Sequence, residues 1–269
     1  MRRFSGVCVE LRLHNMARIV NFPLLVFGLS LLVLWAFARL GAVWRSKLLP
    51  LGEDTRQDFG VVISATLTLL GLLIGFSFSM AISRYDQRKN YEEEEANAIG
   101  TEYLRADLLP AANAETVHEL LRKYLDQRVQ FYEERDRRKI ASINVETARV
   151  QNELWSAVKS AAAAQQTPIV ALAVSGMNDV LNTQGYTQAA WWNRIPIAAW
   201  ALMGAIAICS NLLIGYASRR ADGLVFLVLP LAVSISFLLI ADIDSPRGGF
   251  IRVHPQNLVS LAQSLPDSR

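Results

Sequence analysis

Small side chains recur along one uncharged stretch of the sequence, Gly60–Ile82, at spacings that place them on one face of a helix. They follow one another at intervals of four, three, four and four residues, which keeps them on a single stripe. One interpretation is helix–helix contact, because small residues let helix backbones approach closely within a membrane and Gly71 and Gly75 form a small-xxx-small pair. The other is the wall of a pore, in which Leu72 and Phe76 on a neighbouring face form a constriction that excludes water. The stripe consists of Ser64, Thr68, Gly71, Gly75 and Ser79.

Charged residues stand where two of the apolar segments end. Arg84 and Arg88 follow one segment, and Asp242 and Asp244 follow another. If both ends lie on the same side of the membrane, these residues are expected to form ion pairs. The alternative is a cation site built from the two carboxylates and the backbone carbonyls of residues 245–249, although hard cations prefer six or more oxygen ligands.

The interiors of the apolar segments contain no ionisable side chain, which bears on the kind of transport the chain could perform. Pumps and symporters usually keep ionisable residues within the membrane, even though each costs roughly 2.5–3.5 kcal/mol to insert. Their absence argues against ion-coupled transport and is compatible with a passive pore or an anchor.

Motifs for enzymatic chemistry are missing from the sequence. It has no phosphate-binding loop, dinucleotide-binding glycine motif, zinc-protease motif or nucleophile elbow. The Glu-x-x-His spacing of di-iron bundles occurs once, at Glu115–His118, where such bundles need it twice. The sequence therefore predicts no enzyme, no cofactor and no metal.

The composition places the chain among membrane proteins. Hydrophobic residues make up 52% of its 269 residues, and the mean hydropathy is +0.24. The apolar residues are concentrated in four blocks long enough to cross a bilayer. A net charge of +3 is too small to indicate a nucleic-acid partner. The two cysteines, Cys8 and Cys209, suggest no disulfide framework.

We predict an all-α, four-span integral membrane protein with a helical extramembrane bundle. The bundle is formed by the insertion between spans 2 and 3 and by an extension of span 2. The first apolar block also resembles a signal peptide ending at Ala36–Ala38, although it exceeds the usual 7–15 apolar residues. The predicted parts are a basic N-terminal tail (1–18), a first transmembrane pair (19–82, with spans at 19–38 and 60–82), the helical domain (83–194), a second transmembrane pair (195–241, with spans at 195–216 and 223–241) and a C-terminal tail (242–269).

The second span is expected to continue as a helix beyond the membrane. No proline interrupts it before Pro110, so a rod of roughly 70 Å would leave a hydrocarbon layer of ~30 Å. Its acidic run, Glu92–Glu95, is typical of a solvated helix face, and on a ring of subunits it would form an acidic collar opposing anion entry.

Three further helices are expected in the helical domain. They are predicted to begin near Asn113, Asn144 and Thr167, whose side chains can cap a first turn. Pro168 suits the first position of the last of these helices, which we expect to end near Gly185.

The distribution of basic residues favours a cytoplasmic helical domain. Ten basic residues flank the spans on the side of this domain and the termini, against six on the other side, and cytoplasmic flanks carry the excess. Met16 is a second plausible translation start. Without the residues before it the count becomes seven to six, which favours neither orientation.

Two stretches resemble the bacterial bestrophin-like family of unknown function. They are LLIGFSFSMAISRYDQRKNYEEEEANAIGTEYLR (Leu72–Arg105) and DIDSPRGGFIRV (Asp242–Val253). A more distant resemblance is to the bestrophin anion channels, through Gly75-Phe76 and the basic residues that follow the span. This resemblance implies a pentamer whose termini are cytoplasmic.

The same resemblance implies that the second span lines a hydrophobic neck. It puts Leu72 and Phe76 at neck-lining positions and Thr68 one turn further along, where the threonine is less apolar than the family's residue. No acidic calcium clasp is visible in the C-terminal tail.

The expected function is a homo-oligomeric passive ion channel of the bacterial inner membrane, permeable to small anions such as chloride. Its partners would be the lipid bilayer, further copies of the chain and the permeant anions, with no nucleic acid. The alternative is a non-conducting membrane sensor or scaffold whose helical domain binds a partner.

Overall fold

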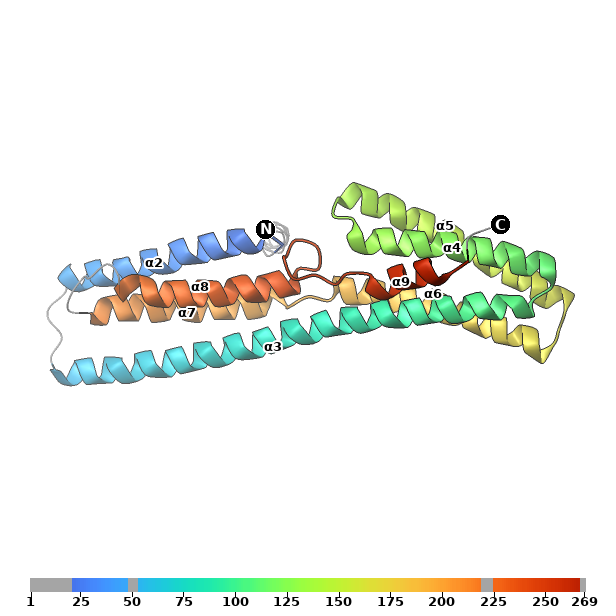
Figure 1. Ribbon diagram of the computed structural model, residues 1–269. Coiled ribbons are helices and arrows are strands. Elements are labelled where there is room, and N and C mark those ends of the chain that lie inside the picture. The colour runs from blue at the N-terminus through green and yellow to red at the C-terminus, as the bar shows by residue number, and fades with distance from the viewer. Residues whose placement is uncertain (1–20, 48–52, 219–224, 267–269) are drawn as a thin grey trace, which may run out of the picture. The chain divides into compact units, whose positions relative to one another are not determined.

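The computed structural model describes residues 21–47, 53–218 and 225–266, and every regular element among them is a helix. The expected all-α class is therefore confirmed. In chain order the elements are α2 (Pro23–Lys47), α3 (Glu53–Arg105), the 3-10 helix η1 (Ala106–Leu108), α4 (Ala111–Glu133), α5 (Arg137–Ala164), α6 (Pro168–Trp192), α7 (Ile197–Ala217), α8 (Val225–Asp244) and α9 (Gln256–Ser264) (Figure 1).

The chain divides into two compact units, which are described separately. The membrane unit comprises Met1–Arg84 and Arg194–Arg252, and the helical domain comprises Tyr85–Asn193 and Val253–Arg269. Helix α3 contributes to both units, because it runs unbroken from Glu53 to Arg105.

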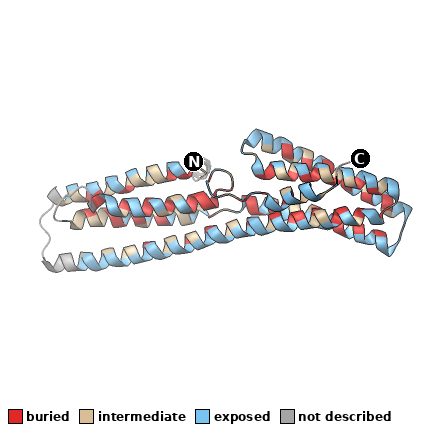
Figure 2. Ribbon diagram, viewed as in Figure 1, coloured by how far each residue is buried: buried red, intermediate tan, exposed pale blue. Residues whose placement is uncertain are grey.

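Four helices of the described residues are long and apolar enough to cross a membrane, which confirms the predicted four-span class. They differ sharply in how much of their surface the chain itself covers. In the most apolar 18-residue window of α8, 50% of the residues are buried, whereas the corresponding window of α3 is 6% buried. Much of the membrane half of α3 is accordingly exposed (Figure 2). Its apolar surface must be covered by lipid or by another protein chain.

Helices α2 and α7 approach each other closely at two glycines. A Cβ on Gly41 would collide with the backbone carbonyl of Leu212, and a Cβ on Gly215 would collide with the carbonyl of Ala38. This is the small-residue contact expected between helices in a membrane. Near the C-terminal end of α2, Arg45 donates a hydrogen bond of 3.0 Å to the carbonyl of Ala217, the last residue of α7. The C-terminal ends of the two helices therefore lie together, and the helices run in the same direction.

The helical domain has an apolar core built by α4, α5, α6 and the second half of α3. Two of its helices begin at side-chain caps. Asp136 Oδ1 accepts the amide N–H of Arg138 at 2.8 Å at the start of α5. Thr167 Oγ1 accepts the N–H of Val170 at 3.3 Å at the start of α6. The fully enclosed apolar residues include Ile99, Val117, Leu121, Val150, Leu154, Val158, Met177 and Val180.

The predicted cap at Thr167 is confirmed, and the start predicted near Asn113 agrees with α4 to two residues, although Asn113 is not its cap. The start predicted near Asn144 and the end predicted near Gly185 were wrong. Helix α4 begins after Pro110 without a side-chain cap. Helix α5 begins seven residues before Asn144, because Asp136 within the charged run caps it instead. Helix α6 passes through Gly185 and ends at Trp192, since a single glycine weakens a helix without ending it.

The boundaries of the membrane helices also differ from the prediction. Helix α2 continues through residues 39–47, and α3 begins at Glu53, so much of the polar connection expected at 39–59 is helical. Helix α7 begins at Ile197, and α8 ends at Asp244. The tail 1–18 and the alternative start at Met16 lie outside the described residues.

Candidate functional site

The face of α3 that the sequence singles out for a pore is exposed in the membrane unit. Leu72 is 53% exposed and Phe76 63% exposed, and Thr68 is exposed as well. The Thr68 hydroxyl donates to the carbonyl of Ser64 at 2.9 Å, which satisfies its hydrogen-bonding donor within the helix. The opposite face of the same segment is buried, at Leu70, Ser77 and Ala81.

The small-residue stripe on α3 makes no close helix contact with the part of the chain that the structure describes. A Cβ added to Gly71 or Gly75 would meet no atom within 4 Å, and Ser64 and Ser79 are exposed. Close packing instead occurs at Gly41 and Gly215, which sequence reasoning missed. A signal was present on α2, because Ala38 and Ala42 stand four residues apart and both lie against Gly215.

Asp244 connects the end of α8, the residues just before α7 and the middle of α3 in the membrane unit. Arg84 Nη1 of α3 lies 3.5 Å from Asp244 Oδ1, and both side chains are largely buried. The same carboxylate accepts the backbone N–H of Ile195 at 3.1 Å, just before α7 begins. Because Asp244 is the last residue of α8, this cluster fixes the membrane-exit point of α3 to the ends of α7 and α8.

Asp242 organises the turn that follows α8 through hydrogen bonds to the backbone. Its two carboxylate oxygens accept the backbone N–H groups of Phe250 at 2.7 Å and Ile251 at 2.8 Å. Gly248 and Gly249 pack so tightly that a Cβ would collide with the carbonyls of Asn21 and Asp242, respectively. Both carboxylates are thus used by the protein, and no cluster of metal-ligating side chains occurs among the described residues.

Two of the four consecutive glutamates on α3 are buried, so the expectation of a wholly solvated acidic face was wrong. Glu92 accepts the N–H groups of Asn257 at 2.9 Å and Leu258 at 3.0 Å, and the Asn257 side-chain amide at 2.6 Å. It therefore caps the N-terminus of α9. Glu93 and Glu94 remain exposed. Nearby, Arg88 Nε donates to the carbonyl of Ala190 at 3.4 Å.

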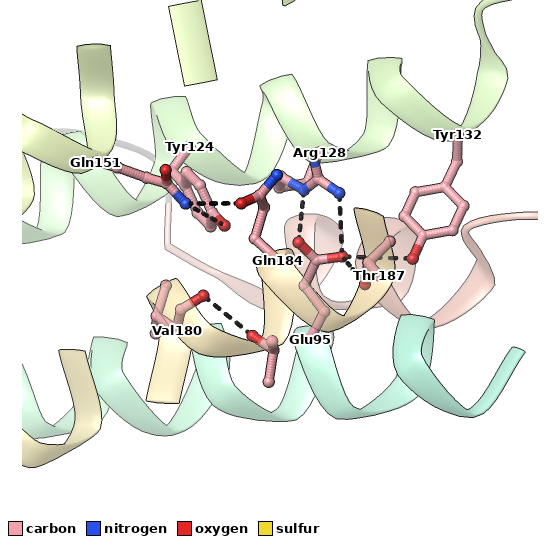
Figure 3. Close-up of polar contacts among 9 residues, drawn as sticks. Glu95, Tyr124, Arg128, Tyr132, Gln151, Val180, Gln184 and Thr187 are labelled. Atoms are coloured by element: carbon pink, nitrogen blue, oxygen red, sulfur yellow. Dashed lines mark hydrogen bonds and ion pairs between the residues drawn. The ribbon is translucent and has the colours of Figure 1, made fainter. Parts of the chain in front are cut away.

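Glu95 is the centre of a buried polar network (Figure 3). Arg128 Nε of α4 donates to Glu95 Oε1 at 2.5 Å, and both side chains are fully buried. The hydroxyls of Tyr132 and Thr187 each donate to Glu95 Oε2 at 3.3 Å. Burial, and then the negative charge of Glu95, raise the pKa of Tyr132 far above its usual value. The network joins α3 to α4 and α6.

Glu102 is a buried carboxyl group of a different kind. It has no exposed surface, and neither of its oxygens meets a hydrogen-bond partner among the described residues. Burial raises its pKa to about 8, against an opposing effect of Arg105 and with a further increase from Asp179. Gly176 on α6 leaves room for it, because a Cβ there would collide with Glu102 Oε2. A pKa of about 8 favours the protonated, uncharged carboxyl group of Glu102 at neutral pH.

These features define an all-helical, multi-pass membrane protein with a helical extramembrane domain. The chain belongs to the bestrophin-like family, because the family model of the Bestrophin-like domain matches residues 24–258. The resemblance predicted from residues 72–105 and 242–253 is thereby confirmed.

Solved structures of a bacterial bestrophin homologue from Klebsiella pneumoniae, including two point mutants, share the fold of this chain. Three of them give TM-scores of 0.57, 0.57 and 0.59 at 15%, 14% and 13% sequence identity. The alignments cover 88%, 90% and 88% of this chain and 98%, 99% and 97% of the homologue. No curated protein matches the chain. At this identity the similarity shows the fold alone.

Proposed function

We propose that the chain assembles into a homo-oligomeric passive ion channel of the bacterial inner membrane, with α3 lining the pore. The observation that carries the proposal is the exposed apolar face of α3, at Leu72 and Phe76, in a membrane unit whose other three spans cover one another better. Around an oligomer axis, such side chains would form a narrow apolar constriction that controls hydration. The absence of ionisable residues inside the spans supports passive conduction rather than pumping.

Paired truncations test the constriction. Purified protein in planar bilayers should conduct, and Leu72→Ala with Phe76→Ala should raise the single-channel current because the constriction widens. The matched control is Leu202→Ala on α7, which removes an apolar side chain of similar exposure, 50% against 53% for Leu72, and should leave the current unchanged. Equal currents in all three proteins would refute the assignment of the pore to this face.

A measurement of which ion the channel conducts tests the proposal further. The family resemblance implies anions, yet the charges along the same helix face are acidic. About eighteen residues make five helical turns, so a residue and its eighteenth successor share a face. The eighteenth successors of Thr68, Leu72 and Phe76 are Asp86, Asn90 and Glu94, and all three are exposed.

Acidic rings attract cations, whereas anion pores use Arg or Lys. In a potassium chloride gradient, a reversal potential near the chloride equilibrium value would support anion permeation. A reversal potential near the potassium equilibrium value would show that the channel conducts cations instead, as expected if the acidic residues determine its selectivity. If Asp86 and Glu94 face the pore, Asp86→Asn with Glu94→Gln should move the reversal potential toward chloride.

A non-conducting sensor or scaffold is the alternative function. Detergent-solubilised protein that remains a monomer would favour it, because one copy of α3 cannot enclose a pore. A channel requires a closed ring of copies.

The proposed cytoplasmic side of the helical domain has its own test. Lys139 is exposed at the start of α5, so a Lys139→Cys variant with Cys8 and Cys209 replaced by Ser should resist membrane-impermeant thiol reagents in intact cells. Labelling in intact cells would mean that the helical domain lies on the outer side of the membrane.

A further inference from the structure

The turn that follows α8 folds back onto the ends of two membrane helices (Figure 1). A Cβ on Gly248 would collide with the carbonyl of Asn21, which stands two residues before the start of α2. A Cβ on Gly249 would collide with the carbonyl of Asp242 in the last turn of α8. The amide of Phe250 donates to Asp242 Oδ1 at 2.7 Å. The turn is thus tied to the start of α2 and to the end of α8.

These contacts place the turn at the edge of the hydrocarbon layer. The apolar span of α8 contains 19 residues, Phe226–Asp244. Such a helix rises about 28 Å, close to the ~30 Å thickness of the layer. Asp242 therefore lies near the edge of the layer, and Phe250, hydrogen-bonded to it, lies at a similar depth. Phe22 lies there as well, because it precedes the first residue of α2.

The surface at this edge combines exposed apolar side chains with basic residues. Phe22, Phe250 and Ile251 are all exposed. Residues 245–253 contain two arginines and no acidic residue. Apolar side chains beside Lys or Arg are typical of segments that lie in the membrane interface, where they meet acyl chains and anionic head groups together.

The outer face of α2, which continues this surface, has the character of a lipid-facing helix. Four exposed residues follow one another there at spacings of three, four and three, which keeps them on one stripe. All four are bulky, whereas contacts between helices within a membrane favour small residues. Leu34 and Ala38, on the opposite face, are buried. The bilayer is therefore a better partner for this stripe than a second copy of the chain. The stripe consists of Phe22, Leu25, Leu29 and Leu32.

We propose that the turn after α8, together with Phe22, is an interfacial anchor that inserts into the head-group boundary of the lipid bilayer. Phe250 and Ile251 contact the upper part of the acyl chains, and the two arginines of the turn lie at the level of the lipid phosphates. Because the turn is tied to both helices, the inserted side chains fix the depth of the start of α2 and the end of α8. This anchor is independent of whether the protein conducts.

A spin-label depth measurement on the full chain in phospholipid vesicles tests the proposal. The label is attached to Phe250→Cys in a protein whose Cys8 and Cys209 are replaced by Ser. Its collision rates with oxygen, which concentrates in hydrocarbon, and with a water-soluble nickel chelate report its depth. The label should lie about 5–10 Å inside the head-group boundary, as the apolar face of an interfacial segment does.

Two further labels calibrate the measurement. Leu104→Cys in the helical domain is the matched control, since Leu104 is 71% exposed and Phe250 75% exposed, and its label should behave as in water. Leu32→Cys should lie deepest, because ten residues of helix, or about 15 Å, separate it from Phe22. A Phe250 label as accessible to nickel as that at Leu104 would overturn the proposal. A label reached by neither reagent would also overturn it and would assign the surface to a subunit interface.

A second experiment tests whether the turn fixes the depth of α2. With the label at Phe22→Cys, Phe250→Gln should shift the label toward water, whereas the matched change Leu104→Gln should leave its depth unchanged. An unshifted label in folded Phe250→Gln protein would overturn the anchoring role. If a Phe250 variant fails to fold, the label at Ile251→Cys decides, because it gives the depth of the turn with Phe250 in place.

Discussion

The membrane unit and the helical domain hold their helices together by opposite means. In the membrane unit, backbones touch at Gly41 and Gly215, and the charged anchor formed by Arg84 and Asp244 stands at the helix ends. In the helical domain, charge enters the core itself, at Glu95 and its partners.

The difference follows from the two surroundings. Lipid offers no hydrophobic force between helices, so close backbone packing must stabilise them. Water outside the membrane does supply this force, and the resulting core can accommodate a carboxylate whose oxygens are all satisfied. The close backbone contact therefore stands on α2 and α7, at Gly41 and Gly215, whereas the buried acids stand on the half of α3 that belongs to the helical domain.

The largest expected effect is at the close helix contact. Gly215→Leu would drive a side chain into the backbone of α2 at Ala38, and a backbone cannot yield as a flexible side chain does. Overpacking commonly costs about 1–3 kcal/mol and more where backbones must separate, so we expect loss of the folded membrane unit. Thermal unfolding of the solubilised protein measures this. Gly71→Leu, on an open face, is the control and should keep its Tm; a stable Gly215→Leu variant would show that the contact is dispensable.

Breaking the buried ion pair should come next. Arg128→Met leaves the Glu95 carboxylate buried without its cation, which typically costs about 3–5 kcal/mol. The double variant Glu95→Gln/Arg128→Met removes both charges and should recover much of that loss in a double-mutant cycle. Additive losses from the two single changes would mean that the residues act independently. The buried ion pair would then not stabilise the helical domain, and the contrast drawn with the membrane unit would fail.

Glu102 should make stability depend on pH. Because burial raises its pKa from 4.5 to about 8, the folded state keeps a proton that the unfolded state releases between these values. Stability should therefore fall as pH rises from about 4.5 to 8 and level off above that. Glu102→Gln should flatten this slope and gain a few kcal/mol at pH 8, since each pKa unit corresponds to about 1.4 kcal/mol. Unfolding measured across this range checks it, with the exposed Glu94→Gln as control; an unchanged slope in Glu102→Gln would contradict the assignment.

Sequence periodicity and composition were enough to predict the spans, the continuous α3 and the capped start of α6. Those features depend on local patterns, such as an uncharged run or Thr167 followed by Pro168. The partners of the acidic residues could not be predicted in the same way. Glu92 and Glu93 are neighbours of identical type, and only the position of α9, more than 160 residues later in the chain, makes one a helix cap and leaves the other in solvent.

The same reason explains why the small-residue stripe was ambiguous. Gly71 and Gly215 both suit close packing by their spacing, yet of these two only Gly215 has a backbone against it among the described residues. Spacing identifies a helix face, and the other helices decide what covers it. The candidate pore face is thus predictable as a face, while its neighbours in an oligomer are not encoded locally.

The smallest expected effect concerns the cap on α9. Glu92→Gln keeps the size of the side chain but weakens the two hydrogen bonds from the first turn of α9, and losing a cap typically costs about 0.5–2 kcal/mol. Because α9 is short, this change should release it locally while the apolar core of the domain keeps its Tm within a few degrees. Hydrogen exchange at the amides of Asn257 and Leu258 should accelerate about ten-fold. The adjacent Glu93→Gln, exposed on the same helix, should leave both amides protected. Equal exchange in the two variants would mean that α9 is held by Leu258 in the core rather than by the carboxylate, and a buried acid would then contribute nothing to the packing of the helical domain at this end.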